Sequence, residues 1–241
     1  MSEEAMEKAE KAMEKAKEYT EKMRKSTLGE PWRIFKIMAE FVDSFEKMSK
    51  EGPSVTVFGS ARTQPDEESY ISAQKMGELL ANNGYGTITG GGPGIMEAAH
   101  KGANEAGGRT IGLNIELPFE QTFNPYQSLG INFHYFFTRK VCFLKYSVAV
   151  IGYPGGFGTM DELFETLTLI QTNKINRIPT VLVGKDFWGP MQGWIENTIL
   201  EDKRISADDL DLYHIVDTAE EAMDIIIEAH KKGIPHTIVE A

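Results

Sequence analysis

The segment from Pro154 to Glu162, PGGFGTMDE, joins a glycine-rich loop to carboxylic acids at the start of an expected helix. Backbone N–H groups that open a helix can bind a phosphate, and a nearby carboxylate can accept a proton or stabilise a developing positive charge. Glu162 is therefore a candidate for such chemistry. The structural alternative is a capping box, because Thr159 and Glu162 have the T-x-x-E spacing in which the glutamate bonds a backbone N–H. The predicted substrate-binding residues of this segment are Pro154, Gly155, Gly156, Gly158 and Thr159.

A second glycine-rich loop, TGGGPGIM, spans Thr89 to Met96. Glycines leave backbone N–H groups unshielded, and the helix expected after them adds its dipole, so this loop is also a candidate for binding phosphate. No Lys-Ser/Thr pair follows it, so it is not a Walker A loop and phosphoryl transfer from ATP is not supported. A tight turn without a ligand is the alternative. The predicted binding residues here are Gly90, Gly91, Gly92 and Gly94.

Two shorter elements complete the candidate site. Gly59 and Ser60 follow an expected strand, and Ser60 can donate hydrogen bonds through its hydroxyl and its backbone N–H. An ordinary strand-to-helix turn is the alternative. Arg139 and Lys140 begin an expected helix, where positive charge opposes the helix dipole. A bound anion or a carboxylate such as Glu162 would compensate that charge, and a solvated basic pair is the alternative. We predict that Gly59, Ser60 and Lys140 contact the substrate.

The elements that would position these residues alternate along the chain from residue 54. Runs of β-branched residues predict strands and the stretches between them predict helices, so the predicted fold class is α/β, a doubly wound, mainly parallel sheet with helices on both faces. In such sheets ligands lie outside the carboxyl ends of the strands, where the loops above should converge. The predicted strands are 54–59, 86–89, 110–115, 131–137, 147–152, 179–183 and 213–216. The predicted helices are 66–83, 95–106, 139–146, 160–172, 189–200 and 219–231.

The chain before this alternation has a different pattern, which predicts a helical extension over 1–50 and a catalytic domain over 51–241. Residues 1–27 carry Ala and Met at helical spacing, which predicts an amphipathic helix lying on the body or on a neighbouring subunit. A break at 28–31 precedes a broader apolar face over 32–48 that needs a partner surface. The stretch 117–130 is the longest irregular segment and is a candidate flap or subunit contact.

Composition narrows the partners of this 241-residue chain. Its formal net charge of −11 argues against a general nucleic-acid binder, although local N–H groups and one or two basic side chains can still bind one phosphate. The single cysteine, Cys142, excludes an intramolecular disulfide and points to a reducing compartment, so we expect a cytoplasmic protein. Neither a signal peptide nor a membrane span is expected. The five histidines lack ligand spacing, so no metal is expected and each is interpreted as structural or surface.

These motifs together resemble the LOG ("Lonely Guy") family of cytokinin riboside 5′-monophosphate phosphoribohydrolases, often labelled lysine decarboxylases. The motifs are GGGPGIM at 90–96, the pair Arg139-Lys140 and PGGFGTMDE at 154–162, and the resemblance covers roughly residues 54–217. It implies a Rossmann-like fold, a homo-oligomer (a dimer or larger), and hydrolysis of AMP or an N6-modified AMP to free base and ribose 5-phosphate without a cofactor. It also implies that Arg139 and Glu162 are the catalytic pair and that both glycine loops bind the nucleotide.

Cleavage of an N-glycosidic bond develops positive charge on the ribose. We therefore expect Glu162 to stabilise that charge and to orient or deprotonate the attacking water, while Arg139 holds ribose or phosphate and keeps Glu162 ionised. Three alternatives stay open: a nucleotide-binding or carrier protein of the same superfamily without turnover, a pyridoxal-phosphate decarboxylase, for which no strong Schiff-base lysine is apparent, and a structural oligomer scaffold. The preferred base, and the choice between cytokinin activation and nucleotide salvage, are open as well.

Overall fold

The computed structural model describes residues 30–117, 122–231 and 233, together with residues 8, 11 and 13–21. The chain divides into two compact units, Met1–Asp43 and Ser44–Ala241. The division falls inside one helix, α2 (Glu30–Met48). The last turn of α2 belongs to the second unit, where Met48 is fully buried and the Cys142 thiol contacts Ser44 Oγ at 3.3 Å.

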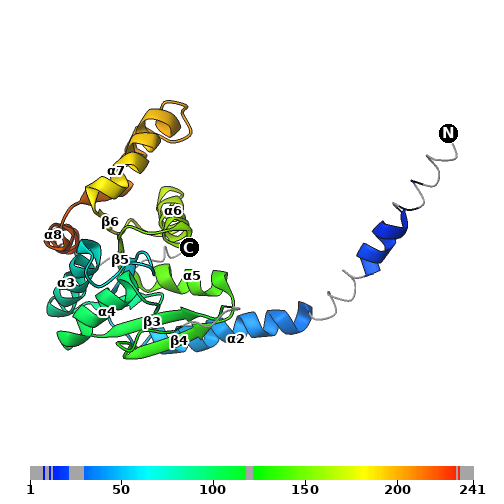
Figure 1. Ribbon diagram of the computed structural model, residues 1–241, viewed down its shortest axis with the longest axis horizontal. Helices are drawn as coiled ribbons and strands as arrows, with labels where there is room; N and C mark the ends of the chain where they lie inside the picture. The colour runs from blue at the N-terminus through cyan, green and yellow to red at the C-terminus, as the bar shows by residue number, and fades with distance from the viewer. Residues whose placement is uncertain are drawn as a thin grey trace. The chain divides into compact units, whose positions relative to one another are not determined.

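The second unit is built on a seven-stranded sheet in which every strand pairing is parallel (Figure 1). The strand order is β4-β3-β2-β1-β5-β6-β7. Helices bury both faces, which explains why most strands are continuous apolar and β-branched runs rather than alternating ones. The predicted α/β class with a doubly wound parallel sheet is confirmed. The strands are β1 (Ser54–Phe58), β2 (Gly86–Thr89), β3 (Thr110–Ile115), β4 (Leu129–Phe133), β5 (Ser147–Gly152), β6 (Thr180–Val183) and β7 (His214–Val216).

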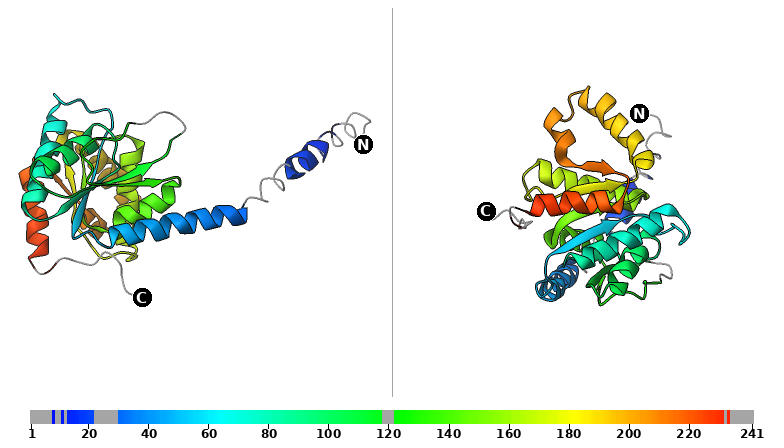
Figure 2. Two further views of the ribbon diagram at one scale, coloured as in Figure 1. Left: turned by 90° about the horizontal axis from the view of Figure 1, so that it is seen from below. Right: turned by 90° about the vertical axis from the view of Figure 1, so that its left-hand side faces the viewer.

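Helices form a layer on each face of this sheet (Figures 1 and 2). One layer holds α3 (Glu68–Asn82), α4 (Ile95–Glu105) and α8 (Ala219–His230). The other holds α5 (Phe136–Lys145), α6 (Phe157–Gln171) and α7 (Lys185–Trp194). Successive residues of a strand point to opposite faces, so Val57 of β1 joins the core under the first layer and Phe58 joins the core under the second.

Several predicted boundaries differ from the observed ones, and some of these differences lie beside the candidate site. Helix α6 begins at Phe157 rather than at residue 160, because Gly158 lies within its first turn instead of in a loop. Strand β4 ends at Phe133 rather than at residue 137, because Phe136 already belongs to α5. The predicted helix 189–200 is α7 followed by a π-helical segment, Ile195–Leu200. A 3-10 helix over Ala207–Leu212 was not predicted.

The first unit is helical where it is described. Residues 8, 11 and 13–21 are helical, and α2 is a continuous helix across the predicted 32–48 segment. Of the apolar positions that predicted the helix over 1–27, Ala5, Met6, Ala9 and Met23 lie outside the described residues, as do residues 28 and 29 of the break. No described helix is long and apolar enough to cross a bilayer.

Candidate active site

The loops that follow β1 and β5 meet at the carboxyl edge of the sheet. These two strands are neighbours, and the chain leaves them toward opposite sides of the sheet. Open α/β sheets bind ligands at such a switch point. The Tyr153 N–H donates to Phe58 O at 2.8 Å, and the Ser60 N–H donates to Pro154 O at 3.0 Å. Contrary to the prediction, Ser60 therefore has no backbone N–H to offer a ligand. Its hydroxyl accepts a bond from the Arg62 N–H and still has its own proton to donate.

The start of α4 packs directly against the loop after β1. A Cβ atom at Gly59 would lie 2.5 Å from the Ile95 side chain, and one at Gly94 would lie 2.3 Å from Ser60 O. The Ile95 N–H donates to the same Ser60 oxygen at 3.0 Å. Gly59 and Gly94 are therefore needed for close packing at the site, whether or not they also touch a substrate.

The Gly90–Gly94 loop is buried at each of its four glycines. Gly91 has φ +72°, and a Cβ atom there would lie 1.8 Å from Asn114 Oδ1. Its N–H donates to Thr89 Oγ1 at 3.0 Å. The expectation that this loop leaves its N–H groups unshielded is therefore wrong at Gly91, because the loop is folded inward against polar side chains.

A buried polar network that the sequence reasoning missed holds this loop in place. Thr89 Oγ1 lies 3.1 Å from His100 Nε2, and His100 Nδ1 lies 3.2 Å from Asn124 Oδ1. The Asn124 N–H then donates to Gly91 O at 2.9 Å. Burial lowers the pKa of His100 to about 4, so the ring is neutral and can accept at one nitrogen while donating at the other. His100 is structural, which was one of the two roles expected for it.

Further anchors of the loop come from the irregular stretch 117–130, of which residues 118–121 lie outside the described part. Asn124 Nδ2 donates to Gly92 O at 3.0 Å, and Gln127 Nε2 donates to Gly91 O at 3.0 Å. Gln127 also bonds Asn114 of β3. The amide side chains in this stretch were the only sequence signal for the network, and they carry no information on which distant backbone oxygens they meet.

The N-terminus of α6 is exposed, whereas the N-terminus of α4 is buried. Gly156 is the N-cap, and no side chain caps the helix. Gly156, Phe157 and Gly158 are exposed, and a Cβ atom at either glycine would meet nothing within 4 Å. Thr159 is buried instead, because its side chain packs on Gly155, where a Cβ atom would lie 2.1 Å from Thr159 Oγ1. The first-turn N–H groups of α6 thus face open space with the positive end of the helix dipole behind them.

The capping-box alternative for Glu162 does not hold in the structure. Thr159 is the third residue of α6 rather than its N-cap, and no side-chain cap is formed. Glu162 lies in the second turn, and its Oε2 atom is buried without a hydrogen-bond partner among the described residues. The carboxylate is therefore not used to satisfy the helix terminus.

Glu162 is buried and Arg139 is half-buried, and each has a buried polar atom without a hydrogen-bond partner among the described residues. Arg139 Nε has no hydrogen bond among the described residues, and the guanidinium carbon lies 5.1 Å from the centre of the Phe143 ring. Burial raises the pKa of Glu162 to about 7, while the charges of Lys140 and Arg139 act in the opposite direction. Burial lowers the pKa of Arg139, and Glu162 opposes that shift. The two charges attract each other but form no direct ion pair within the described residues.

Lys140, which we predict to contact the substrate, forms ion pairs with two carboxylates. Its Nζ atom lies 2.9 Å from Asp161 Oδ2 and 3.1 Å from Glu165 Oε2, so one ammonium joins two acids that are one turn apart on α6. Its side chain is only 17% exposed. These bonds raise the pKa of Lys140 against the effect of its burial. The ammonium fixes α5 to α6 beside Glu162, and a direct contact to substrate stays a prediction.

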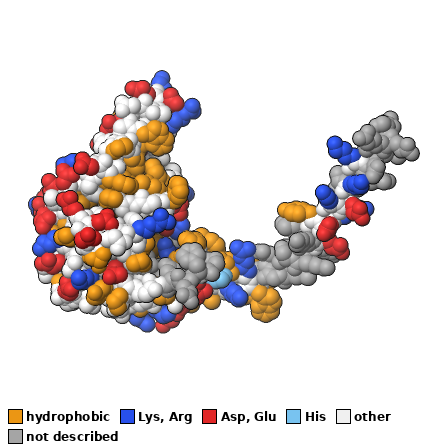
Figure 3. Space-filling view, viewed as in Figure 1, with side chains coloured by type: hydrophobic (Ala, Val, Ile, Leu, Met, Phe, Trp, Pro, Cys, Tyr) orange, Lys and Arg blue, Asp and Glu red, His pale blue; other side chains and the backbone are white. Residues whose placement is uncertain are grey.

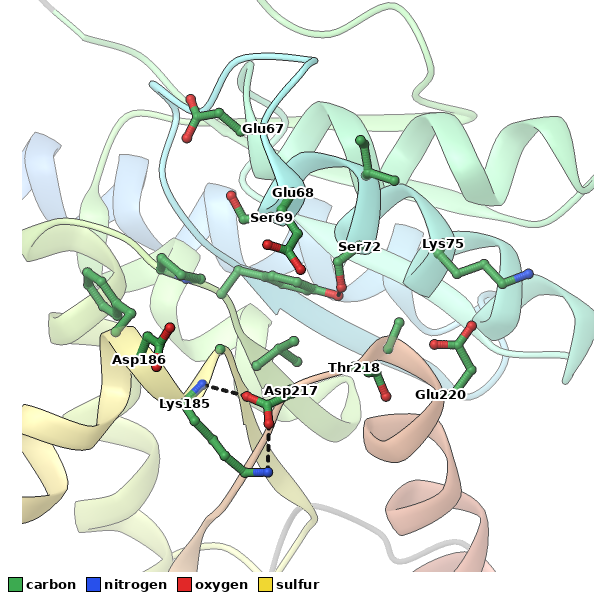
Figure 4. Close-up of a pocket in the computed structure, with 17 residues that line it drawn as sticks. Glu67, Glu68, Ser69, Ser72, Lys75, Lys185, Asp186, Asp217, Thr218 and Glu220 are labelled. Atoms are coloured by element: carbon green, nitrogen blue, oxygen red, sulfur yellow. Dashed lines mark hydrogen bonds and ion pairs between the residues drawn. The ribbon is translucent and has the colours of Figure 1, made fainter.

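A separate cavity of about 690 Å³ lies at the carboxyl ends of β5, β6 and β7 (Figure 4). It shares Pro154 with the loop after β5, but neither Arg139 nor Glu162 lines it. Lys185 Nζ, on its wall, is already bound to Asp217 Oδ2 at 2.7 Å. The lining has five carboxylates against two lysines, which disfavours a phosphate there. The carboxylates belong to Glu67, Glu68, Asp186, Asp217 and Glu220, and the lysines are Lys75 and Lys185.

Comparison with known sequences finds a family model described as "Possible lysine decarboxylase", which matches residues 96–226, more than half of the chain. A probable cytokinin riboside 5′-monophosphate phosphoribohydrolase of Oryza sativa is 29% identical over 138 residues, covering 54% of this chain and 54% of the rice protein. The cytokinin riboside 5′-monophosphate phosphoribohydrolase of Rhodococcoides fascians is 28% identical over 153 residues, 61% of this chain and 76% of its own length. A pyrimidine/purine nucleotide 5′-monophosphate nucleosidase of Escherichia coli is 28% identical over 168 residues, 64% of this chain, which spans 37% of that protein.

Solved structures share the fold. The structural-genomics target TM1055 matches with a TM-score of 0.55 and 26% identity, covering 73% of this chain and 99% of its own. The molybdenum cofactor (Moco) carrier protein of Chlamydomonas reinhardtii matches with a TM-score of 0.53 and 25% identity, covering 75% of this chain and 98% of its own. Proteins similar to this chain are thus named both as nucleotide hydrolases and as a carrier.

Proposed function

We propose that this chain hydrolyses the N-glycosidic bond of a nucleoside 5′-monophosphate. The chain belongs to the family described as possible lysine decarboxylases, and relatives of it are named cytokinin riboside 5′-monophosphate phosphoribohydrolases. The substrate is AMP or an N6-modified AMP, and the products are the free base and ribose 5-phosphate. One observation carries the proposal: within the part of the chain that the structure describes, Glu162 and Arg139 each have a buried polar atom without a hydrogen-bond partner, and Glu162 lies on the helix whose N-terminus is open. Buried polar atoms are normally satisfied, so such a pair indicates a site that a polar ligand completes.

The reaction needs a carboxylate beside C1′ and a group that holds the phosphate. In our proposal the bond from C1′ to the base breaks as water attacks C1′, Glu162 takes one proton of that water, and the departing base anion takes up a proton from solvent to become the free base. Its carboxylate also stabilises the positive charge that develops on the ribose. A pKa of about 7 suits a general base at neutral pH, since about half of the groups are then ionised and ready to accept a proton. Arg139 binds ribose or phosphate and favours the ionised form of Glu162.

The two glycine loops have separate tasks in this proposal. The open first turn of α6, with Gly156, Gly158 and the Thr159 hydroxyl, binds the 5′-phosphate. The closed Gly90–Gly94 loop supports the site from behind, because a Cβ atom at Gly90 would lie 3.7 Å from Arg139 Nη2. The loop after β1, with Ser60, and the loop after β5, with Pro154 and Gly155, fix the spacing between these parts.

Decarboxylation through a Schiff base is not supported by the lysines near the site. A lysine nucleophile needs a lowered pKa, so that its amine is free to attack a carbonyl. Lys140 is held by two carboxylates, and these raise its pKa above the ordinary value. Lys185 is paired with Asp217, which also raises its pKa.

The test is Glu162→Gln with AMP as substrate and adenine release followed by chromatography. We expect the rate to fall by roughly 10²- to 10⁴-fold, the usual contribution of a positioned acid–base group. The exposed acid Glu105 provides the matched control, since Glu105→Gln makes the same chemical change away from the site and should leave the rate unchanged. Adenine release by Glu162→Gln at the wild-type rate would remove the basis of the proposal.

A second candidate function is a carrier without turnover, favoured by the likeness to the molybdenum cofactor carrier. Thermal stabilisation by AMP tests binding, and adenine release in the same sample tests hydrolysis. The wild-type protein is tested with a panel of nucleoside monophosphates that includes N6-modified AMP. Thermal stabilisation without release of free base from any of them would favour the carrier. The same panel identifies the preferred base if there is turnover.

We expect the catalytic unit to work as a homo-oligomer, because apolar side chains are exposed around the site. Phe157 is 96% exposed, and a groove of about 670 Å³ runs along α6 between Phe157, Met160 and Phe164. Figure 3 shows hydrophobic side chains gathered over α6 on this face. Light scattering after gel filtration measures the mass.

A further inference from the structure

Helix α2 exposes an apolar stripe that the proposed activity does not use. Trp32, Phe35 and Val42 are 73%, 61% and 66% exposed, and Ala39 between them is exposed as well. The rings of Trp32 and Phe35 lie together, with centroids 5.9 Å apart. These four residues, the α2 stripe, all belong to the first compact unit. Contiguous exposed apolar surface of this kind marks an interaction site.

The spacing of the α2 stripe is that of a coiled-coil seam. Steps of three, four and three residues separate Trp32, Phe35, Ala39 and Val42, which matches the a and d positions of a heptad repeat. Lys36 follows Phe35 and Asp43 follows Val42, so both charges occupy e positions along the same edge of the seam. Charges at e positions set partner choice and orientation in coiled coils.

We propose that the α2 stripe binds the same stripe of a second copy of this chain, with the two helices antiparallel and crossing at Ala39. Equal e edges face each other in an antiparallel pair, so Lys36 of each copy would meet Asp43 of the other. A parallel pair would place each e position against a g position of the partner, so Lys36 would meet Pro31 and Asp43 would meet Met38, and no opposite charges would face each other. The small side chain of Ala39 at the crossing lets the helices approach closely. This pairing is independent of the proposed hydrolysis and goes beyond it.

A second copy fits the α2 stripe better than a lipid surface does. Helices that lie on anionic membranes carry an excess of Lys and Arg on the polar face. Residues 30–43 have two basic side chains, Arg33 and Lys36, against three acidic ones, Glu30, Glu40 and Asp43. A self-complementary charge order within an acidic segment therefore favours the second copy over a lipid surface.

Cross-linking of the full chain tests the pairing directly. Cys142 is the only cysteine and is buried, so Ala39→Cys adds a single accessible thiol at the crossing point. Disulfides need Cα atoms about 4.4–6.8 Å apart, which holds only where the helices cross. Under mild oxidation we expect Ala39→Cys to run mostly as a covalent dimer on a non-reducing gel. Arg33→Cys, off the stripe, and the wild-type chain should both stay single.

A charge swap then tests the orientation. Added to Ala39→Cys, either Lys36→Glu or Asp43→Lys should lower the dimer yield several-fold, and both together should restore it. Lys50→Glu makes the same charge change outside the stripe and serves as the control, with circular dichroism to confirm folding. The antiparallel pairing would be overturned by any of three outcomes. Arg33→Cys could cross-link as well as Ala39→Cys, Ala39→Cys could stay a single chain after oxidation, or the double swap could fail to restore dimers.

Discussion

The loops before α4 and α6 are both rich in glycine but have opposite structures. Both follow a parallel strand, both are rich in glycine and both open a helix, yet the Gly90–Gly94 loop is buried and hydrogen-bonded while Gly156 and Gly158 are exposed with open space around them. In the first loop, side chains are excluded because protein atoms already occupy the space. In the second, nothing in the described protein occupies it.

This contrast shows that glycine density alone does not identify a phosphate site. A buried loop needs glycine for positive φ and close approach, as Gly91 does. An uncapped helix start with exposed glycines leaves N–H donors available, and that is the arrangement anions bind. The two loops should therefore respond to substitution in different ways, one through stability and the other through binding.

The largest effect is expected from Gly91→Ala, because alanine would need the left-handed φ of +72° and its Cβ would overlap Asn114 Oδ1. Backbone strain of about 1–2 kcal/mol and overpacking of about 1–3 kcal/mol together predict a loss near 3 kcal/mol in the free energy of unfolding. Thermal or urea denaturation measures it. Gly156→Ala is the matched control, with an expected smaller loss of about 1 kcal/mol, because alanine is a poorer N-cap residue than glycine. Equal stability of the two variants would remove the contrast.

The network behind the first loop predicts a pH-dependent stability that involves His100. Its pKa is about 4 in the folded protein and about 6.5 when unfolded, so protonation favours the unfolded chain. Stability should therefore fall by up to about 3 kcal/mol as pH drops from 6.5 to 4. His100→Gln should flatten this part of the pH profile, and the exposed His134→Gln should not. The measurement is urea unfolding at several pH values, and parallel curves for wild type and His100→Gln would contradict the assignment.

The periodicity of the chain predicted the sheet well, because each strand and helix is specified by its own run of residues. Strands β2, β3 and β5 match their predicted ranges, and the resemblance placed Arg139 and Glu162 as a pair. The start of α6 was missed because Gly156 and Gly158 are typical loop residues. Only the packing of Thr159 on Gly155 shows why the helix begins at Phe157.

The closed state of the first loop was beyond prediction for a different reason. It depends on Asn124, Gln127 and His100 bonding backbone and side-chain groups that are up to 36 residues away in the chain. Polar side chains in loops meet many partners of equal chemistry, so no periodicity selects among them. The ion pairs of Lys140 with Asp161 and Glu165 could not be predicted for the same reason, since a lysine beside a glycine-rich site is as suited to phosphate as to carboxylates.

A smaller effect, on binding, is expected at the open loop. In Gly156→Ala a methyl group enters the space over the first turn of α6, where we place the phosphate. We expect AMP to bind about tenfold more weakly, which corresponds to about 1.4 kcal/mol, while the protein stays folded. Calorimetric titration with AMP measures this, best in the Glu162→Gln background where turnover is slow. Undiminished affinity would place the phosphate elsewhere and leave the two loops alike in function.

The smallest effect distinguishes a positioning role of Lys140 from a phosphate contact. The positive charges of Lys140 and Arg139 lower the pKa of Glu162 and so oppose the effect of its burial, and the effect of Lys140 is the larger of the two. Lys140 also pairs with Asp161 and Glu165 nearby. In Lys140→Met the pKa of Glu162 should rise above its value of about 7. Since Glu162 acts as a carboxylate, activity increases with pH through this pKa, so the acid limb of the kcat profile should move to higher pH.

At pH 6 we therefore expect Lys140→Met to lose several-fold in kcat, with most of the loss recovered at pH 9. Lys140→Arg keeps the charge between the same acids and should restore the wild-type profile. Lys174→Met, an exposed lysine after α6, controls for the loss of one surface charge. A contact to the substrate phosphate would instead raise KM at every pH and leave the acid limb in place. The separation of kcat from KM across pH thus decides whether the charge at Lys140 serves the carboxylate of Glu162 or the open loop of α6.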